Sequence, residues 1–188
     1  MPLQNIKTPV QIPENIYLIG MMGSWKSTVG KRLADNLNVS FTDTDNSVEE
    51  KAELSVGAIF SEKGSEYFRM LESEIIKETA NQPPHVIATG GGAVLYECNR
   101  TVFQKYGLTI YLKATPAVLA KRIRNVGRRP ILQKEKDPLR KIETILQERK
   151  HLYDTVSDII IDTDGSDPFA VRKMIIQCLK EKYGDNIG

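Results

Sequence analysis

A short glycine-rich stretch carries the residues best suited to bind phosphate. Gly20 and Gly23 precede Lys26 and Ser27, and this spacing nearly matches the phosphate-binding pattern G-x-x-x-x-G-K-[ST]. In such a loop the backbone N–H groups and the N-terminus of the following helix face one concavity and attract anions. The lysine then reaches the β- and γ-phosphates of a nucleotide, and the hydroxyl ligates magnesium. The stretch therefore predicts a nucleotide phosphate site.

One residue of this loop departs from the pattern. Trp25 stands where glycine is expected, directly before the lysine. Glycine suits that position because a Cβ competes with the phosphates for space and because glycine adds backbone freedom. The indole either turns outward, to solvent or onto a neighbouring helix, or it fills the β-phosphate position. We expect the second arrangement, in which ATP binds at least about tenfold (~1.4 kcal/mol) more weakly than it does to Trp25→Gly.

Two acids and a run of glycines follow short apolar segments. Asp43 and Asp45 end one such segment, and Gly90, Gly91 and Gly92 follow another. Taken alone, the acids fit ordinary turn or cap positions. Beside a phosphate loop, one carboxylate can hold magnesium and the other can accept the proton of an attacking hydroxyl. Three glycines cost backbone entropy, so we expect a ligand to approach them closely.

Arginines at two positions suggest an acidic substrate. Arg69 lies in the helical pattern that follows the acidic loop, and Arg149 lies near the end of a later helical pattern. A planar guanidinium binds carboxylates bidentately. The basic, glycine-broken residues 124–129 could bind RNA, but they lack interleaved aromatic residues. A lid that brings positive charge onto a transferring phosphate fits them better. His85 and His151 fit packing or surface roles.

The elements that must position these groups alternate between short apolar strands and helices. We expect strands at residues 16–19, 39–43, 85–88, 108–112 and 158–161, of which 85–88 and 158–161 should be buried. We expect helices at residues 28–37, 66–79, 99–106, 115–123, 138–153 and 168–183, and residues 46–54 are compatible with a helix. Thr115 is the expected N-cap of its helix. This alternation predicts an α/β fold with a parallel sheet covered on both faces. Ligands of such sheets bind beyond the carboxyl ends of the strands, where the loop, the acids and the glycines fall.

Composition narrows the class of protein. The 188 residues are 40% hydrophobic and 27% charged, with a net charge of +2, which favours one globular domain over residues 1–188 and gives no support to nucleic-acid binding. Residues 1–14 carry three prolines and are expected to form a loose lead-in. Cysteine occurs twice without a metal-type spacing, no apolar run approaches the ~20 residues of a membrane span, and no signal-peptide pattern is present. These features predict a cytoplasmic protein.

The motifs taken together resemble the shikimate kinase family from about residue 16 to residue 183. The matching pieces are Gly20-Met-Met-Gly-Ser-x-Lys-Ser-Thr-Val-Gly30, Phe41-x-Asp43-Thr-Asp45, Gly64-x-Glu66-x-Phe68-Arg69-x-x-Glu72, Ala88-Thr-Gly-Gly-Gly-Ala-Val94, Arg129-Pro-Ile-Leu132 and Arg149-x-x-Leu152-Tyr153. The resemblance implies a three-layer P-loop kinase fold with five parallel strands in the order 2-3-1-4-5, a substrate subdomain and a lid at residues 122–136. It also implies transfer of the ATP γ-phosphate to the 3-hydroxyl of shikimate, in aromatic amino-acid biosynthesis.

The resemblance assigns roles to several of the matching residues. Asp45 is the implied base, with Lys26 and Arg129 as the other catalytic residues, and magnesium is held by Ser27 and Asp43. ATP is bound by Gly23, Ser24, Trp25, Lys26, Ser27, Thr28, the lid arginines Arg122 and Arg129, and Ser166 in the adenine-side loop. Shikimate is bound by Asp45, Arg69, Gly90, Gly91, Gly92 and Arg149. The implied partners are shikimate and ATP, with Mg²⁺ as cofactor, a monomeric chain, and neither nucleic acid nor membrane.

Other functions stay open from the sequence alone. Because of Trp25, the chain could be a catalytically impaired relative that binds shikimate or a partner but turns ATP over poorly. An adenylate-type or gluconate-type kinase is a weaker alternative, since paired arginines around a glycine triplet argue against a nucleotide acceptor. A coupled ADP-release assay with shikimate, run beside Trp25→Gly, separates these possibilities.

Overall fold

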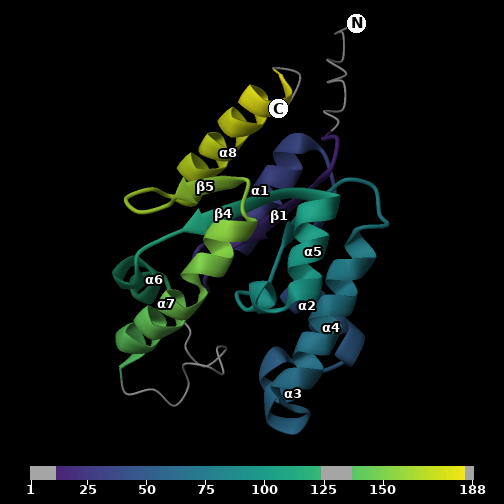
Figure 1. Cartoon of the computed structure of the whole chain (residues 1–188), viewed down its shortest axis with the longest axis vertical. Helices are drawn as coiled ribbons and strands as arrows, with labels where there is room; N and C mark the ends of the chain where they lie inside the picture. The colour runs from purple at the N-terminus through teal and green to yellow at the C-terminus, as the bar shows by residue number, and fades with distance from the viewer. Residues whose placement is uncertain (1–11, 124–136, 185–188) are drawn as a thin grey trace, which may run out of the picture.

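The computed structural model describes residues 12–123 and 137–184, which fold around one parallel sheet. Its five strands lie in the order β2-β3-β1-β4-β5, as the family resemblance implies. Strands β1, β4 and β5 are labelled in Figure 1. The strands are β1 (Asn15–Ile19), β2 (Phe41–Asp43), β3 (Val86–Ala88), β4 (Gly107–Lys113) and β5 (Ile159–Asp162). The helices are α1 (Lys26–Leu37), α2 (Thr44–Ala52), α3 (Val56–Glu62), α4 (Gly64–Thr79), the 3-10 helix η1 (Ala93–Leu95), α5 (Glu97–Tyr106), α6 (Pro116–Arg122), α7 (Pro138–Val156) and α8 (Pro168–Tyr183).

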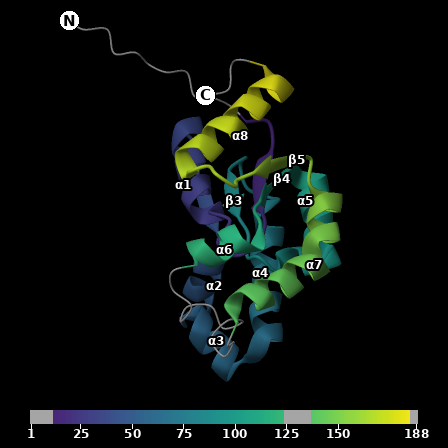
Figure 2. The ribbon, with the colours of Figure 1, turned by 90° about the vertical axis from the view of Figure 1, so that its left-hand side faces the viewer.

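The sheet separates two hydrophobic clusters because alternate residues of a strand face opposite sides. In β1, Ile16 and Leu18 pack against α1 and α8, whereas Tyr17 and Ile19 pack against α4, α5 and α7. Figure 2 shows α1 and α8 on one side of the strands and α5 and α7 on the other. The result is the predicted three-layer arrangement, with a core on each face of the sheet.

A third group of helices packs around a cluster of its own. Helices α2, α3 and α4 share their own apolar cluster, which is formed by Val48, Ile59, Phe68, Leu71 and Ile75. This cluster packs the helices that carry Asp45 and Arg69 against one another. Helix α4 also joins this cluster to the sheet, because its Ile76 packs with Tyr17 and Ile19 of β1.

Three local expectations need correction. Strand β5 is an edge strand and only Ile161 of it is buried, while Ile160 is 48% exposed, so the apolar run does not mark a fully buried strand. Residues 12–14 are not loose, because Ile12 is buried in the core and Glu14 accepts a hydrogen bond from the Tyr183 hydroxyl. Thr115 begins α6 as its N-cap residue, but its side chain makes no capping hydrogen bond.

Most of the predicted lid, including Arg129, lies outside the described residues, as do residues 1–11 of the lead-in. Within the described ranges, no helix is both long and apolar enough to cross a membrane.

Candidate active site

The phosphate loop joins β1 to α1, as its motif predicts. Gly20 and Gly23 both have left-handed φ values, of 142° and 84°, and a Cβ at Gly20 would lie 2.6 Å from the carbonyl oxygen of Leu112. These positions therefore require glycine. Lys26 Nζ donates to the carbonyl oxygens of Gly20 and Met21, at 2.9 and 3.0 Å, and its side chain is buried within the loop. These two hydrogen bonds hold the ammonium group inside the curve of the loop.

Trp25 adopts the backbone conformation that glycine would supply. Its φ of 69° and ψ of 19° are left-handed, and its carbonyl oxygen accepts the first hydrogen bond of α1 from the Val29 N–H at 2.8 Å. The indole lies against α6, with the Arg122 guanidinium carbon 3.3 Å from the centroid of the indole, and it packs on the edge of the core under α1. This is the outward arrangement, so the expectation that the ring fills the β-phosphate position is wrong.

Two acids lie where β2 ends and α2 begins. Asp43 is the N-cap of α2, and its Oδ1 accepts a hydrogen bond of 3.0 Å from the Asp45 N–H. Asp45 stands in the first turn of the helix, where the macrodipole favours a negative charge. The capping contact fixes the Asp43 side chain relative to the first turn of α2. The prediction that Asp43 is a cap residue is therefore confirmed.

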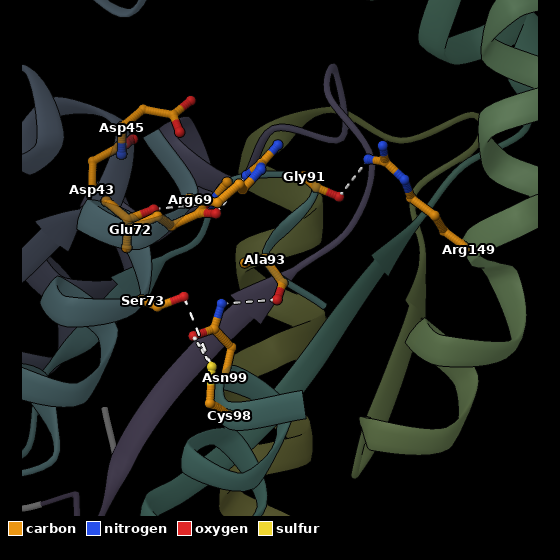
Figure 3. A network of polar contacts seen from close by, with 12 residues as sticks. Asp43, Asp45, Arg69, Glu72, Ser73, Gly91, Ala93, Cys98, Asn99 and Arg149 are labelled. Atoms are coloured by element: carbon orange, nitrogen blue, oxygen red, sulfur yellow. Dashed lines mark hydrogen bonds and ion pairs between the residues drawn. The ribbon is translucent and has the colours of Figure 1, made fainter. Parts of the chain in front are cut away.

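Helix α4 places an ion pair beside these acids. The carboxylate of Glu72 is fully buried, and its Oε2 accepts a short, charge-assisted hydrogen bond from Nη1 of Arg69 one helical turn away. Burial raises the pKa of Glu72, and the Arg69 charge opposes that rise. Its other oxygen, Oε1, has no hydrogen-bond partner among the described residues. The pair therefore fixes the guanidinium of Arg69 at the rim of a buried carboxylate (Figure 3).

The glycine triplet follows β3 and lies directly on this pair. A Cβ at Gly90 would collide with Oε1 of Glu72 and come within 3.0 Å of Asp45 Oδ1. A Cβ at Gly92 would lie 2.7 Å from Cζ of Arg69. Two of the three positions are thus glycine because protein side chains occupy the space, which is a different reason from the expected approach of a ligand.

The middle glycine links the triplet to α7 and to the phosphate loop. Its carbonyl oxygen accepts hydrogen bonds from Arg149 Nη1 at 3.0 Å and from the Tyr153 hydroxyl at 2.5 Å (Figure 3 shows the first). Burial raises the pKa of Tyr153 to about 12, so this hydroxyl stays a donor at neutral pH. On the other side, a Cβ at Gly91 would lie 3.2 Å from the amide nitrogen of Met22. The triplet is therefore the point at which the predicted substrate and phosphate residues meet.

The remaining predicted residues border this centre. Ser24 is buried, whereas Ser27 and Thr28 are exposed in the first turn of α1, and Ser166 is half-buried beyond β5. Arg122 ends α6 and donates to Thr163. Two residues had no role assigned from the sequence, Glu72 and Tyr153. Their spacing in the sequence could have indicated both residues, because Glu72 follows Arg69 by three residues and Tyr153 follows Arg149 by four, each on the same helix.

Known proteins resemble this chain along most of its length. The family model described as "Shikimate kinase" matches residues 22–180. The "Shikimate kinase" of Moorella thermoacetica is 43% identical over 169 residues, which make up 90% of this chain and 96% of that protein. The "Shikimate kinase" of Aeromonas salmonicida is 36% identical over 165 residues, or 88% of this chain and 96% of that protein. The structure "Shikimate kinase from Acinetobacter baumannii in complex with shikimate" superposes with a TM-score of 0.87 at 32% identity, over 90% of this chain and 94% of that chain.

Proposed function

The chain belongs to the shikimate kinase family, and we propose that its site transfers the γ-phosphate of ATP to the 3-hydroxyl of shikimate by the residue roles set out below. Phosphoryl transfer needs positioning and charge neutralisation more than covalent catalysis. The observation that carries the proposal is the meeting of three groups at Gly90, Gly91 and Gly92. They are a fixed guanidinium pair, an acid at a helix start and a phosphate loop.

The two arginines bind the substrate carboxylate. Arg69 is held by Glu72 on one side of the triplet, and Arg149 is held by the Gly91 carbonyl on the other. Both guanidinium groups keep further N–H donors for an anion, because each is a five-donor fork. A buried carboxylate placed between them gains charge-assisted hydrogen bonds. This arrangement favours an acid over a neutral sugar or a nucleotide as the acceptor.

Asp45 orients the attacking hydroxyl and accepts its proton. It lies beside Gly90 at the entrance to α2, opposite the buried Glu72. Lys26 exchanges its present contacts with the loop carbonyls for the oxygens of the transferring phosphate. Arg129, as a lid residue, adds positive charge over the phosphates.

The donors in the loop and at the β2 end suit magnesium. Mg²⁺ binds through one or two protein oxygens and fills its other positions with water and phosphate, so the Ser27 hydroxyl and the Asp43 carboxylate form a sufficient set. The described residues contain no cluster of three or more acidic, His or Cys ligands, which is consistent with a metal that arrives with the nucleotide. When bound, the ion neutralises charge on the β- and γ-phosphates.

A coupled ADP-release assay tests the function. We expect ADP release that depends on shikimate, with gluconate and AMP as inactive acceptors, and a loss of at least about 10²-fold in kcat for Asp45→Asn. ADP release that gluconate or AMP supports better than shikimate would contradict the proposal. We also propose that the chain works as a monomer and needs neither nucleic acid nor membrane, and light scattering of the active protein checks the oligomeric state. No observation favours the impaired-relative alternative, because the Trp25 ring lies against α6.

A further inference from the structure

The only tryptophan of the chain holds an unusual position in the phosphate loop. Trp25 directly precedes Lys26 and has a φ of 69°, a region that residues with a Cβ avoid. Its ring is half-buried and packs on the edge of the core. A side chain that keeps a disfavoured backbone conformation needs a compensating contact, and the contact present is with Arg122.

Three contacts hold the guanidinium of Arg122. Its guanidinium carbon lies 3.3 Å from the Trp25 ring centroid, Nη1 donates to Thr163 Oγ1 at 2.8 Å, and Nη2 donates to the Thr163 carbonyl oxygen at 2.6 Å. Thr163 is itself fully buried and donates its hydroxyl proton to the carbonyl oxygen of Lys113 at 2.9 Å. The two hydrogen bonds fix one edge of the guanidinium. The indole covers a face, which stops rotation about that edge.

We propose that Trp25 is a positioning residue for nucleotide binding, which fixes the guanidinium plane of Arg122 at the side of the phosphate loop. This inference rests on the proposed kinase function. The stack joins the residue before Lys26 to the end of α6, so a cation has a set orientation beside the loop before the anionic nucleotide arrives. A glycine at this position would remove the backbone strain, but it would leave Arg122 free to turn about its two bonds to Thr163.

Steady-state kinetics of Trp25 variants test the inference. We expect Trp25→Ala and Trp25→Gly to raise the KM for ATP about fivefold, with the KM for shikimate unchanged, and Trp25→Phe to fall between them and the natural protein. Arg122→Ala should raise the KM for ATP as well. Because Trp25 acts through Arg122, Trp25→Ala should have no further effect in the Arg122→Ala background.

An exposed aromatic at the amino end of β4 provides the matched control. The Tyr106 ring is 41% exposed and lies under Lys105 Nζ at 5.1 Å, at the end of α5 where β4 begins. Tyr106→Ala should leave both KM values unchanged. A Trp25→Gly protein that binds ATP as tightly as the natural one, or more tightly, would overturn the inference. Additive effects of Trp25→Ala and Arg122→Ala would overturn it as well.

A binding measurement separates this inference from the function itself. The fluorescence of the single indole should change in Arg122→Ala and on titration with ADP, and calorimetry with ADP gives the affinity of each variant without turnover. A chain that binds ADP but does not phosphorylate shikimate contradicts only the proposed function. Equal ADP affinities for the natural protein, Trp25→Ala and Trp25→Gly contradict only the role of Trp25.

Discussion

An added methyl group at Gly92 should separate binding of shikimate from the stability of the fold. In Gly92→Ala the three atoms nearest to the new Cβ all belong to the guanidinium of Arg69, and Cζ would lie 2.7 Å away. Non-bonded carbon atoms pack at separations of about 3.5 Å or more, so the guanidinium must move away by ~1 Å. That movement also pulls Arg69 away from the buried carboxylate of Glu72.

The magnitude follows from the size of this displacement. A misplacement of about 1 Å at a positioning group can cost about 10²-fold in rate, which corresponds to ~2.7 kcal/mol of transition-state stabilisation. We therefore expect kcat/KM for shikimate to fall about 10²-fold and the KM for ATP to stay unchanged. The displaced atoms end a side chain rather than belong to backbone, so the free energy of unfolding should drop by only about 1–2 kcal/mol.

Two measurements and one control complete this test. Kinetics with each substrate varied give the two KM values, and urea unfolding gives the stability. Gly57→Ala is the control, because its Cβ would meet only the Ser55 hydroxyl at 4.0 Å within α3. If Gly92→Ala were folded and its kcat/KM for shikimate lay within about threefold of the Gly57→Ala value, Arg69 would not be the group that binds the substrate.

Three further predictions address other parts of the structure. Arg149→Ala should weaken shikimate binding by about 2–5 kcal/mol while ATP binding persists, since it removes one partner of a charged contact; unchanged calorimetric affinity would refute this role. Tyr153→Phe removes the 2.5 Å hydrogen bond to Gly91 and should lower the free energy of unfolding by about 1 kcal/mol and raise the KM for shikimate, as urea unfolding and kinetics would show. Burial lowers the pKa of His85 below 6.5, so the folded state binds fewer protons than the unfolded state and loses stability as pH falls below that value. Urea unfolding at pH 7.5 and 5.5 should show a larger loss than in His85→Gln, and equal losses would contradict it.

The layered fold could be predicted because its strands and helices are short and locally consistent. The apolar runs of β1, β3 and β4 stand in the centre of the sheet, where both faces are covered, and there the pattern and the burial agree. The run of β5 is as apolar, but the strand lies at the edge and exposes Ile160. Composition alone does not distinguish an edge strand from a central one. The strand order came only from the family resemblance, because parallel strands of this kind can be joined in several orders.

The candidate site was partly predictable for a similar reason. The carboxyl ends of parallel strands lie on the same side of a sheet. From the sequence alone, this rule predicted that the phosphate loop, the two acids and the glycine triplet lie close together. It could not reveal Glu72, because an acid three residues after an arginine on a helix usually forms a surface pair. Only the packing of α4 against Gly90 buries this acid and makes it the group that holds Arg69.

Trp25 illustrates a different limit of the motif. The pattern gives a reason for glycine before the lysine, namely space near the phosphates, and it is silent on where a larger side chain would go. That direction depends on the backbone, and Trp25 keeps the left-handed conformation of the loop. The ring then reaches Arg122, a residue from another element that no local pattern connects to it. A departure from a loop motif is therefore no measure of lost activity until the partner of the new side chain is known. Here that partner is Arg122, a cation beside the phosphate loop. We therefore propose that the indole, which was expected to block nucleotide binding, supports it by positioning this cation.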